Sequence, residues 1–575
     1  MLFGATALVA VVLIAGAWVG SRAWLAYGEL QEARSGATKL QEKFAENPAS
    51  IIGDIEDLGE HTARAADLTS DPIWRAAEII PWAGPNLEAF RVTADSLDTV
   101  VRAVGAPLVE HVDAMQSSLA LTDGRVALEP LVEMRSASAN ANTQMKKVVA
   151  DMHGIKREKL VPQLADAVAE FTELLQPVSV GVSAVSDTTA LLPGMLGLGG
   201  SRDTLLLFLN NAEVRSTMGI PGALALLNAN DGRIALTQQA STLDFPVYPE
   251  PVARLSPDLR GTYGDKPALW VQNVTMLPEF PLTGELAVTM WERNFGVRPQ
   301  AVVAVDPVTL SYILEATGPI SLESGESLSS DNAVDLLMHE VYVRYEDPAD
   351  QDAFFADASA RVFTAVSSGD FEVQKFVKAL TRGAAEDRIK LWSSVSDEQS
   401  VIDGTSLAGT LTTARSTTPK FTMQLNDGTG AKMDYFLTTK ATLTGDLGPN
   451  SESDEIVVRY TMSNTAPADA GISLPGYITG GGNYGVEPGS IATVARLFAP
   501  GGFNLLSQQV DGSSENAGES LQLLDRSVAQ WNPTLAPGES RTIELRYRVE
   551  IPNVHAVEWR QTPTFSNDIS NAITY

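Results

Sequence analysis

The 575-residue sequence contains no cysteine, and this absence removes several kinds of chemistry at once. Disulfide bonds, thiolate metal sites, iron–sulfur clusters and cysteine nucleophiles all require this residue. Histidine is scarce, and its five positions show no spacing typical of a zinc site: His61, His111, His153, His339 and His555. A GxSxG motif in a plausible order with His and Asp is also missing. The sequence therefore favours neither a thiol enzyme, a zinc hydrolase nor a serine hydrolase.

Basic residues are few relative to acidic ones. The chain has 41 Lys and Arg residues against 71 Asp and Glu residues, which gives a formal net charge of −30 at pH 7. A surface of this sign repels phosphate backbones, and no long Lys/Arg cluster offsets it, so we expect no nucleic-acid partner. Hydrophobic residues at 44% and charged residues at 19% are typical of a folded protein rather than a disordered one.

One long hydrophobic run stands out, residues 2–20 (LFGATALVAVVLIAGAWVG), and it carries no charge. At 1.5 Å per residue, a helix of this length matches the hydrocarbon thickness of a bilayer. The run lacks the preceding basic residues of a secretory signal peptide, since Arg22 is the first Lys or Arg. It predicts a transmembrane anchor over residues 1–23, with the rest of the chain on one side of the membrane. A buried helix of a soluble protein is the alternative.

Residues 24–190 are predicted to form a bundle or stalk of long helices. Apolar residues recur there at steps of three and four, as in Leu97, Val101 and Val104. Proline disfavours helix before it and removes a donor, so breaks are expected at Asn47-Pro48, at Asp71-Pro72 and from Pro81 to Pro85. Nothing in this part resembles a catalytic cluster. We interpret it as a spacer or as a stalk through which a homo-oligomer forms.

The pattern changes at the Gly-rich residues 191–203, after which strands and helices alternate. Strands are predicted at residues 204–209, 223–227, 234–236 and 301–305, and helices at residues 284–294 and 307–317. The glycines precede a strand instead of following one, so they do not form a nucleotide-binding turn. Residues 200–398 are therefore expected to fold as a three-layer α/β domain.

Beyond about residue 400 the apolar period becomes two. Apolar and polar side chains alternate over residues 542–551, and similar runs occupy residues 432–442 and 455–462. These strands predict a β-sandwich over residues 399–575. The aromatic and Asn-rich residues 477–484 (YITGGGNY) either hold a sugar by stacking or form an ordinary loop.

Polar side chains gather near the ends of the predicted α/β strands and in the segments after them: Asn210, Asn211, Glu213, Arg215, Asp244, Asn273 and Arg344. Open α/β sheets bind ligands at the carboxyl edge of their strands. Arginines together with carboxylates suit a phosphorylated ligand and a divalent cation such as Mg²⁺. An arginine at a strand edge usually keeps its guanidinium in water. Each of these residues could equally be a surface ion-pair partner or a turn residue, so the spacing leaves both roles open.

Five segments resemble the bacterial domain-of-unknown-function family 4012: residues 71–87 (DPIWRAAEIIPWAGPNL), 207–234, 273–291, 302–320 and 426–436 (NDGTGAKMDYF). Members of that family are single-pass envelope proteins found largely in Gram-positive bacteria. The resemblance implies an extracytoplasmic protein anchored in the plasma membrane. Across residues 202–370 that family is in turn similar to the LytR-CpsA-Psr domain, whose enzymes move glycopolymers from a polyprenyl-pyrophosphate carrier onto peptidoglycan.

The similarity to the LytR-CpsA-Psr domain implies roles for five residues. They stand where the enzymes have the Asp and Arg closing the first strand, the third-strand Asp, a helix-leading Asn and a late Arg: Glu213, Arg215, Asp244, Asn273 and Arg344. As a set they imply a pyrophosphate-binding site.

Two departures from the enzyme pattern remove further ligands. Ile220-Pro221-Gly222 replaces an Arg-Ser-Asp segment, and Leu243 replaces an Arg. Phosphoryl transfer depends on such electrostatic stabilisation. We therefore expect a protein that binds a lipid-linked or polymeric glycan, such as a polyprenyl-linked glycan or peptidoglycan, during envelope polysaccharide assembly or export. An active glycopolymer phosphotransferase using Mg²⁺ and a purely structural or adhesive surface protein are the alternatives.

Overall fold

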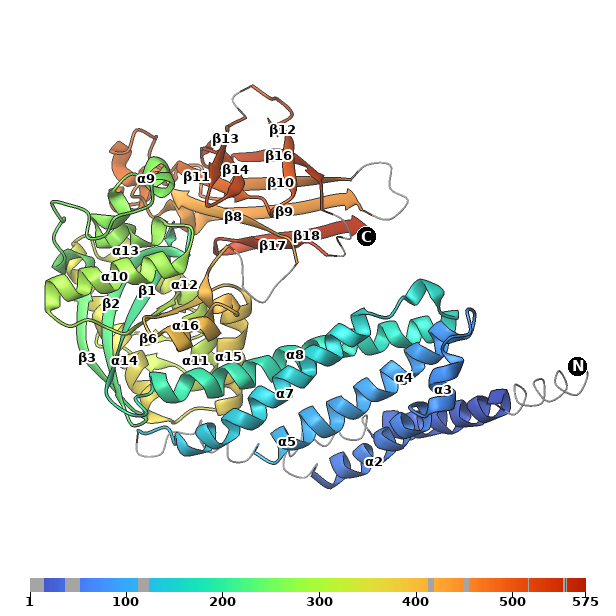
Figure 1. The fold of residues 1–575 in the computed structure, drawn as a ribbon. Coiled ribbons are helices and arrows are strands. Elements are labelled where there is room, and N and C mark those ends of the chain that lie inside the picture. Colours follow the sequence, from blue (N-terminus) through green and yellow to red (C-terminus); the bar gives the residue numbers. More distant parts are fainter. Residues whose placement is uncertain are drawn as a thin grey trace, which may run out of the picture. The chain divides into compact units, whose positions relative to one another are not determined.

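The computed structural model describes residues 15–36, 52–111, 124–411, 418–447, 454–515, 517–551, 554 and 556–574. The chain divides into two compact units, one of residues 1–120 and 126–194 and one of residues 121–125 and 195–575. The first unit is helical and the second combines helices with several sheets (Figure 1). The predicted multidomain α+β fold class is therefore confirmed.

The first unit begins with a helix over residues 15–36. The later elements are α2 (Ile52–Thr69), α3 (Pro72–Ala77), α4 (Gly84–Asp98), η2 (Thr99–Gly105), α5 (Ala106–Val109), α7 (Glu129–His153), η3 (Arg157–Lys159) and α8 (Pro162–Met195). The predicted break at Asp71-Pro72 is confirmed, because α2 ends at Thr69. The break predicted from Pro81 to Pro85 is confirmed in its first part, because α3 ends at Ala77 and α4 begins at Gly84. The predicted break at Asn47-Pro48 lies outside the described residues.

Small and branched apolar residues form the seams of this bundle. The first helix buries Val19, Ala26 and Ala33, which recur every seven residues, as expected for helices that pack side by side. Ala33 belongs to one core cluster with Val101 of η2. Val104 belongs to a second cluster, formed with residues of α7 and α8. The apolar series predicted from the sequence thus lies in the core of the bundle.

No helix among the described residues is long and apolar enough to cross a membrane. The predicted transmembrane segment over residues 1–23 falls mainly on residues 1–14, which lie outside the described residues. Its last residues belong to the helix over residues 15–36.

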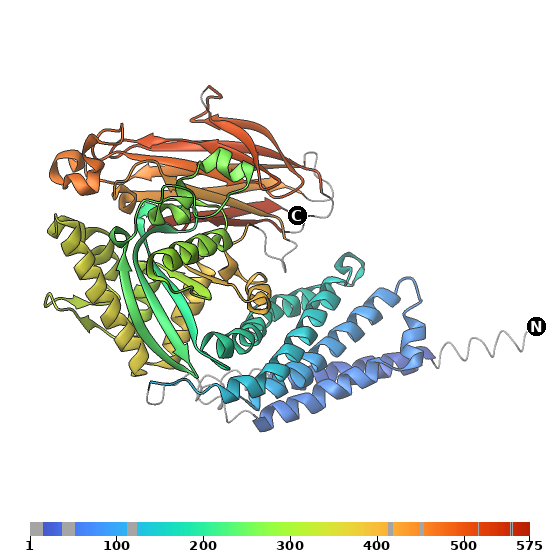
Figure 2. The ribbon, with the colours of Figure 1, turned by 60° about the vertical axis from the view of Figure 1, so that its left-hand side comes forward.

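A mixed five-stranded sheet forms the first half of the second unit (Figure 2). Its order is β3-β2-β1-β4-β7, with β1 (Arg202–Val214), β2 (Gly219–Asn230), β3 (Arg233–Ser241), β4 (Ala301–Val305) and β7 (Ile389–Ser393). Only β1 and β4 run parallel, and the other neighbours are antiparallel. The four predicted strands are confirmed. However, β1 continues to Val214, so Asn210, Asn211 and Glu213 lie within the strand and not after it.

Helices cover both faces of this sheet, which gives three layers (Figure 2). The helix α10 (Phe280–Phe295) and the turn η6 (Val271–Met276) share a core with β1 and β4 on one face. The other elements of this half are η4 (Thr242–Asp244), α9 (Pro257–Tyr263), η5 (Lys266–Ala268), α11 (Pro307–Thr317), β5 (Ile320–Ser321), β6 (Ser327–Leu328), α12 (Ala333–Asp335), η7 (Leu336–Glu340), α13 (Val341–Arg344), α14 (Pro348–Ser368), α15 (Val373–Ala385), α16 (Ser396–Ile402) and η8 (Ser406–Ala408). The helix predicted at 307–317 is confirmed: Asp306 caps its start, and Gly318, at φ 77°, ends it.

The second half of the unit consists of two sheets that share one core containing Phe421, Leu443, Tyr460 and Leu497. Their orders are β12-β16-β10-β9-β18 and β13-β14-β11-β8-β17, with β15 paired to β11. The strands are β8 (Lys420–Asp427), β9 (Leu437–Asp446), β10 (Glu455–Asn464), β11 (Ile491–Phe498), β12 (Phe503–Val510), β13 (Glu519–Leu523), β14 (Arg526–Trp531), β15 (Thr534–Leu535), β16 (Ser540–Val549), β17 (Glu558–Gln561) and β18 (Ser566–Thr574). The intervening turns are η9 (Met433–Phe436), α17 (Ala470–Ser473), α18 (Gly476–Thr479) and η10 (Gly480–Gly482).

The strand predicted at residues 432–442 is wrong in its first half. Residues Met433–Phe436 form the turn η9, and β9 begins only at Leu437. The reason is tertiary: Lys432 and Asp434 are buried by contacts with the end of β1, which a continuous strand would not satisfy.

The bundle core predicts the effect of a buried charge. Val101 is buried and packs on Ala33, so Val101→Asp places an unpaired carboxylate among apolar side chains and lowers the free energy of unfolding by several kcal/mol. Val180→Asp in α8 is the matched control, because Val180 is 65% exposed. Thermal unfolding followed by circular dichroism measures both. Equal melting temperatures for the two variants would contradict the assignment of Val101 to the core.

Candidate functional site

Five charged side chains are buried together where β1 meets the C-terminal sheets. We call them the Glu213 cluster: Glu213, Arg215, Asp427, Lys432 and Asp434. Each is at most 8% exposed. Glu213 and Arg215 come from the end of β1, Asp427 ends β8, and Lys432 and Asp434 belong to the segment that leads into β9.

The Glu213 carboxylate is the centre of this cluster. One of its oxygens pairs with Arg215 and the other with Lys432. The Arg215 guanidinium also lies 3.7 Å from Oδ2 of Asp427. Asp434 accepts a hydrogen bond of 2.9 Å from the backbone N–H of Val214. The cluster therefore fastens the last residues of β1 to the C-terminal sheets.

Neighbouring amide and hydroxyl groups strengthen the same junction. The backbone N–H of Ser216 donates to Oδ1 of Asn426 at 3.1 Å, and Nδ2 of Asn426 donates to the Ser216 hydroxyl at 2.7 Å. The carbonyl of Ser216 accepts from the Thr562 hydroxyl at 3.0 Å. Buried polar groups are costly unless they are paired, so these contacts fix the position of the chain after β1.

Three carboxyl groups in the cluster face only two cations. Burial raises the pKa of Glu213, but Lys432 and Arg215 outweigh it, so this pKa is lowered and Glu213 is charged. Burial, followed by the Glu213 carboxylate, raises the pKa of Asp427 to about 7. Burial and Asp427 raise the pKa of Asp434 well above its usual value. One proton on the two aspartates leaves the cluster electrically neutral.

The remaining predicted site residues lie in different settings. Asp244 caps its own turn, because its Oδ2 accepts from the backbone N–H of Ser241 at 2.8 Å. Asn273 is half-buried in η6. Arg344 is 41% exposed and pairs with Glu326 and Glu340. In the described residues, no hydrogen bond or ion pair joins these three side chains to Glu213 or Arg215.

The expectation that Arg215 keeps its guanidinium in water is wrong. Its side chain is 6% exposed, and its guanidinium forms ion pairs with Glu213 and Asp427. Burial lowers the pKa of Arg215, but these carboxylates outweigh it and raise it overall. The structure thus brings Glu213 and Arg215 together as a buried pair rather than as an open anion site.

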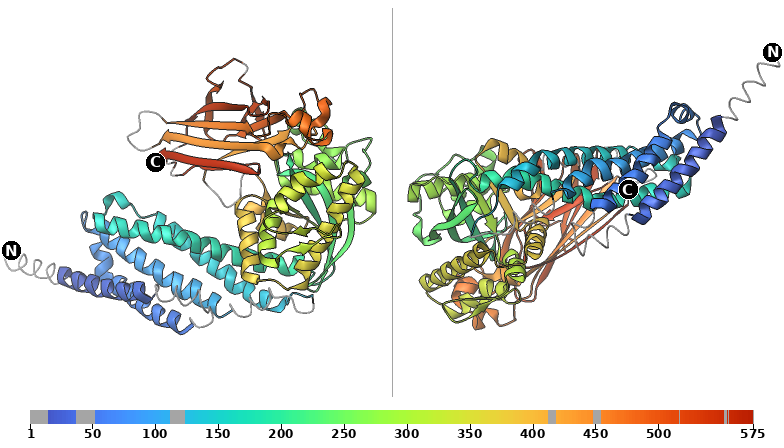
Figure 3. Two further views of the ribbon diagram at one scale, coloured as in Figure 1. Left: turned by 180° about the vertical axis from the view of Figure 1, so that it is seen from behind. Right: turned by 90° about the horizontal axis from the view of Figure 1, so that it is seen from below.

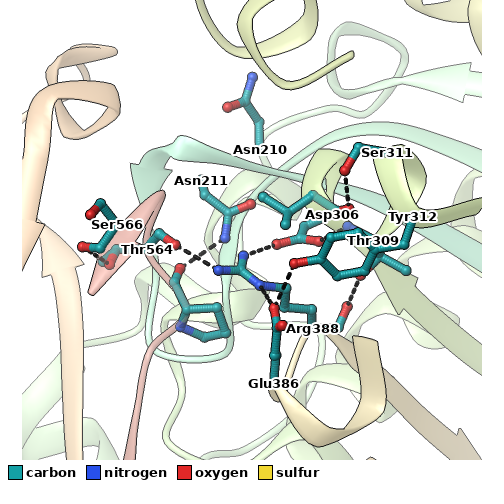
Figure 4. Close-up of polar contacts among 12 residues, drawn as sticks. Asn210, Asn211, Asp306, Thr309, Ser311, Tyr312, Glu386, Arg388, Thr564 and Ser566 are labelled. Atoms are coloured by element: carbon teal, nitrogen blue, oxygen red, sulfur yellow. Dashed lines mark hydrogen bonds and ion pairs between the residues drawn. The ribbon is translucent and has the colours of Figure 1, made fainter. Parts of the chain in front are cut away.

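A second group, which we call the Arg388 cluster, joins the buried Arg388 to the buried Asp306 and to Glu386, which is 36% exposed, at the end of β4 (Figure 4). Nη1 of Arg388 lies 2.6 Å from Oδ2 of Asp306, and Nε lies 3.0 Å from Glu386. Its Nη2 donates to the carbonyl of Thr564 at 2.8 Å. The Tyr312 hydroxyl donates to Glu386 at 2.8 Å, and burial followed by this contact raises the pKa of Tyr312 to about 12. Arg388 is therefore neutralised as fully as Arg215.

An apolar cavity of about 50 Å³ borders the Arg388 cluster, because Asp306 is part of its lining. Its apolar walls include Phe208 of β1, Leu310 of α11 and Leu337 of η7, together with Phe355 and Ala358 of α14. The polar residues in its lining are Asn210, Asp306 and Ser359. Figure 4 shows Asn210 pointing away from the Arg388 cluster, whereas Asn211 turns toward it and donates to the carbonyl of Pro563 at 2.9 Å. The cavity has room for a few water-sized groups.

Aromatic rings connect this cavity to the surface. Tyr342 accepts a hydrogen bond from Nδ2 of Asn210, and its ring centroid lies 5.9 Å from that of Phe355. On its other side it stacks on Tyr477, with centroids 5.7 Å apart and planes at 26°. Tyr477 and Tyr484 are 43% and 51% exposed. We call Phe355, Tyr342 and Tyr477 the aromatic path.

The described residues offer little for a metal ion. They contain no group of three or more His, Asp or Glu side chains placed to hold one. In the first unit, a groove of about 730 Å³ between α4 and α7 is lined by charges of both signs: Glu88, Asp95, Asp98, Asp151, Arg91, Lys147, Lys156 and Lys159. Since these four acids and four bases balance one another, the groove shows no preference for a ligand of one charge.

Sequence reasoning missed the partners that decide these settings. Asp306 stands between a strand and a Pro-initiated helix, which is the signal of an N-cap. Lys432 and Asp434 lie in a segment that resembles a family and that the apolar pattern predicted as the start of a strand, so neither signal indicated a buried charge. Arg388 lies next to a short buried strand, where a charged residue indicates a partner in the core.

A family comparison bears on part of the second unit. Residues 199–342 match the family described as protein of unknown function DUF4012. The match runs from the start of β1 into α13, so it includes Glu213, Arg215, Asp244 and Asn273 but not Arg344. The predicted resemblance to this family is confirmed over that range, and the similarity to LytR-CpsA-Psr enzymes stays a prediction. No curated protein matches the chain.

The charge balance of the Glu213 cluster predicts opposite outcomes for two isosteric changes. Glu213→Gln leaves Arg215 and Lys432 buried with too little negative charge and lowers the free energy of unfolding by about 3–5 kcal/mol. Asp434→Asn resembles the protonated aspartate and keeps an acceptor for Val214, so it costs about 1 kcal/mol or less. Urea unfolding at pH 7 measures both values. A larger loss for Asp434→Asn than for Glu213→Gln would contradict the assignment of charges.

The raised pKa of Asp427 also predicts a pH dependence. The folded state binds a proton on Asp427 up to about pH 7, whereas the unfolded chain releases it near the ordinary aspartate pKa of 3.8. The stabilisation from this proton is fully present below about pH 4 and is lost as the pH rises to about 7. Asp427→Asn should therefore gain stability relative to the parent over this interval, by at most about 1.4 kcal/mol per pH unit. A constant difference between the two proteins from pH 4 to pH 7 would show that Asp427 is ionised throughout.

Proposed function

We propose that the second unit binds a lipid-linked envelope glycan, and that the chain is anchored in the plasma membrane through residues 1–23 with its bulk outside the cytoplasm. The observation that carries the proposal is the aromatic path, which joins an apolar cavity to the exposed Tyr477. A lipid-linked glycan has the matching chemistry, an apolar chain at one end and sugar rings at the other. The uncharged run at residues 2–20 and the family resemblance support the location.

The apolar end of such a ligand fits the cavity by its chemistry. Burying each methylene group contributes about 0.8 kcal/mol, and the walls formed by Phe208, Leu310 and Phe355 are apolar. At about 50 Å³ the cavity holds only the first part of an isoprenoid chain. A longer stretch requires the helix α14, which forms one wall, to move away from the sheet.

The sugar end fits the exposed part of the aromatic path. Tyr477 is 43% exposed, and tyrosine combines an apolar face with a polar hydroxyl, as sugar stacking requires. Tyr484, seven residues later, is 51% exposed. Tyr477 is held in place by Tyr342 beneath it, and Lys432 Nζ lies 5.8 Å from the centroids of both rings. An ordered platform of this kind loses little conformational freedom when a ligand binds.

The ion pairs of the two buried arginines favour glycan binding without transfer over transferase activity. A pyrophosphate leaving group needs cations that are not already neutralised. Arg215 is paired with Glu213 and Asp427, and Arg388 with Asp306 and Glu386. The alternative of an active glycopolymer phosphotransferase would require these pairs to open. A structural role with association of copies through the helical unit is the other alternative, and it makes no use of the cavity.

Two variants of the full chain test the proposal, with a short-chain polyprenyl-pyrophosphate disaccharide as the probe. Tyr477→Ala removes the stacking ring and should weaken binding about tenfold, which corresponds to about 1.4 kcal/mol. Ala358→Phe fills the cavity and should weaken binding of the lipid-linked probe but not of the free disaccharide.

Ile472→Ala is the control, because Ile472 is 93% exposed nearby in the sequence and has no aromatic face. Isothermal titration in detergent gives the dissociation constants. Undiminished binding in both test variants, or an absence of binding by the parent protein, would contradict the proposed function.

A further inference from the structure

Apolar side chains project from the turn between α3 and α4 in the helical unit. Ile79 and Trp82 are each 81% exposed, and Ile80 is 41% exposed. Large apolar side chains exposed side by side are unusual on a soluble surface and indicate an interaction. We use the name bundle tip for these three residues together with three basic residues of the turn between α7 and α8: Lys156, Arg157 and Lys159.

The turn that carries these residues is held firmly. Trp74 of α3 is fully buried, and its indole N–H donates to the carbonyl of Leu87 at 3.1 Å. Glu78 pairs with Arg91 of α4 at 2.7 Å. A Cβ on Gly84 would lie 2.0 Å from the carbonyl oxygen of Glu78, so only glycine permits this close turn. The exposed isoleucines and Trp82 are thus presented by a rigid support rather than by a flexible loop.

The turn between α7 and α8 lies beside this support and is basic. The backbone N–H of Val161 donates to Oδ1 of Asn86 at 2.8 Å, which joins the two turns. Lys156, Arg157 and Lys159 are exposed in this turn, where Glu158 is the only acid. Lys156 and Lys159 also line the groove between α4 and α7, which holds Glu88, Asp95, Asp98 and Asp151. In the described residues none of these three bases has an ion-pair partner within the bundle. In a chain with a net charge of −30, this concentration of positive charge is distinctive.

The N-terminal helix reaches the same end of the bundle. Nε of Arg22 lies 2.8 Å from Oδ2 of Asp71, the residue that caps α3. One turn earlier, Trp18 is 44% exposed. The Cζ atom of Arg22 lies 5.1 Å from the centroid of the Trp18 ring. Figures 1 and 3 show the start of this helix, α3 and the turn between α7 and α8 at one end of the helical unit. The described part of the N-terminal helix, residues 15–36, therefore starts at this end of the bundle.

We propose that the bundle tip docks on the surface of the lipid bilayer, with Ile79, Ile80 and Trp82 in the interface and Lys156, Arg157 and Lys159 on anionic headgroups. This inference rests on the proposed membrane anchoring and adds a second contact to it. Tryptophan prefers the bilayer interface, and each basic residue near an anionic surface adds to the attraction. The charge complementarity and the position of the N-terminal helix select a bilayer over a second copy of this acidic chain.

The absence of native cysteine permits a direct test in the full chain reconstituted into vesicles. An environment-sensitive fluorophore is attached to Ile79→Cys and, as a control, to Val180→Cys. Val180 is 65% exposed and lies about 27 Å along α8 from its start, at 1.5 Å per residue. Vesicles contain either phosphatidylcholine alone or a mixture with phosphatidylglycerol, and brominated lipids serve as quenchers.

The account predicts a blue-shifted emission at position 79 that brominated lipid quenches at least twofold, with no quenching at position 180. Quenching is stronger in the anionic vesicles, and the combined changes Lys156→Gln, Arg157→Gln and Lys159→Gln reduce it to the phosphatidylcholine level. The change Trp82→Ser also reduces it.

The outcomes separate the two proposals. A protein that floats with the vesicles but carries an unquenched probe at position 79 overturns the docking proposal alone. Blue-shifted emission without lipid quenching shows that protein covers the tip, and it overturns the proposal as well. A protein that fails to float contradicts the anchoring on which the inference rests.

Discussion

The second unit depends on one buried carboxylate. The Glu213 carboxylate pairs with Arg215, which directly follows the same strand, and with Lys432, from the segment that leads into β9. One side chain therefore ties the α/β sheet to the C-terminal sheets. Ionised groups are expensive to bury, and the cost is recovered only when the geometry and the charge balance are both satisfied. The raised pKa values of Asp427 and Asp434 supply that balance through a proton.

This use of charge limits what the unit can do chemically. The strand end where an α/β sheet usually binds its ligand is covered by the C-terminal sheets. The arginines there, Arg215 and Arg388, already form ion pairs with carboxylates of the protein. What remains accessible nearby is apolar and aromatic: the cavity beside β1 and Tyr477, which stacks on Tyr342. The chemistry of the accessible surface therefore suits recognition of a ligand better than phosphoryl transfer, and it is the basis of the proposed glycan binding.

Much of the fold could be predicted because it follows local patterns. The strand at 301–305 and the helix at 307–317 were placed to the residue, since an apolar run, an Asp-Pro start and a glycine end are all local signals. The turn at 433–436 could not be placed, because it forms to bring Lys432 and Asp434 to a strand more than two hundred residues earlier.

The candidate site shows the same division. Glu213 and Arg215 were selected from their place after an apolar run, and the structure brings them together. Their burial was not foreseen, because the residues that cover them come from a part of the chain that the pattern assigned to a separate domain. Arg344 was expected to join them, but its partners are Glu326 and its helical neighbour Glu340. Spacing identifies charged residues, whereas the partner that neutralises each of them depends on tertiary contacts.

A double-mutant cycle between Glu213 and Lys432 tests the central claim most directly. Unfolding free energies are measured for the parent, Glu213→Gln, Lys432→Met and the double variant. If the pair joins the two halves of the unit, the double variant is more stable than the sum of the single losses implies, with a coupling energy of about 1–3 kcal/mol. Losses that add to within about 0.5 kcal/mol would show that the two side chains act independently, and they would contradict the account.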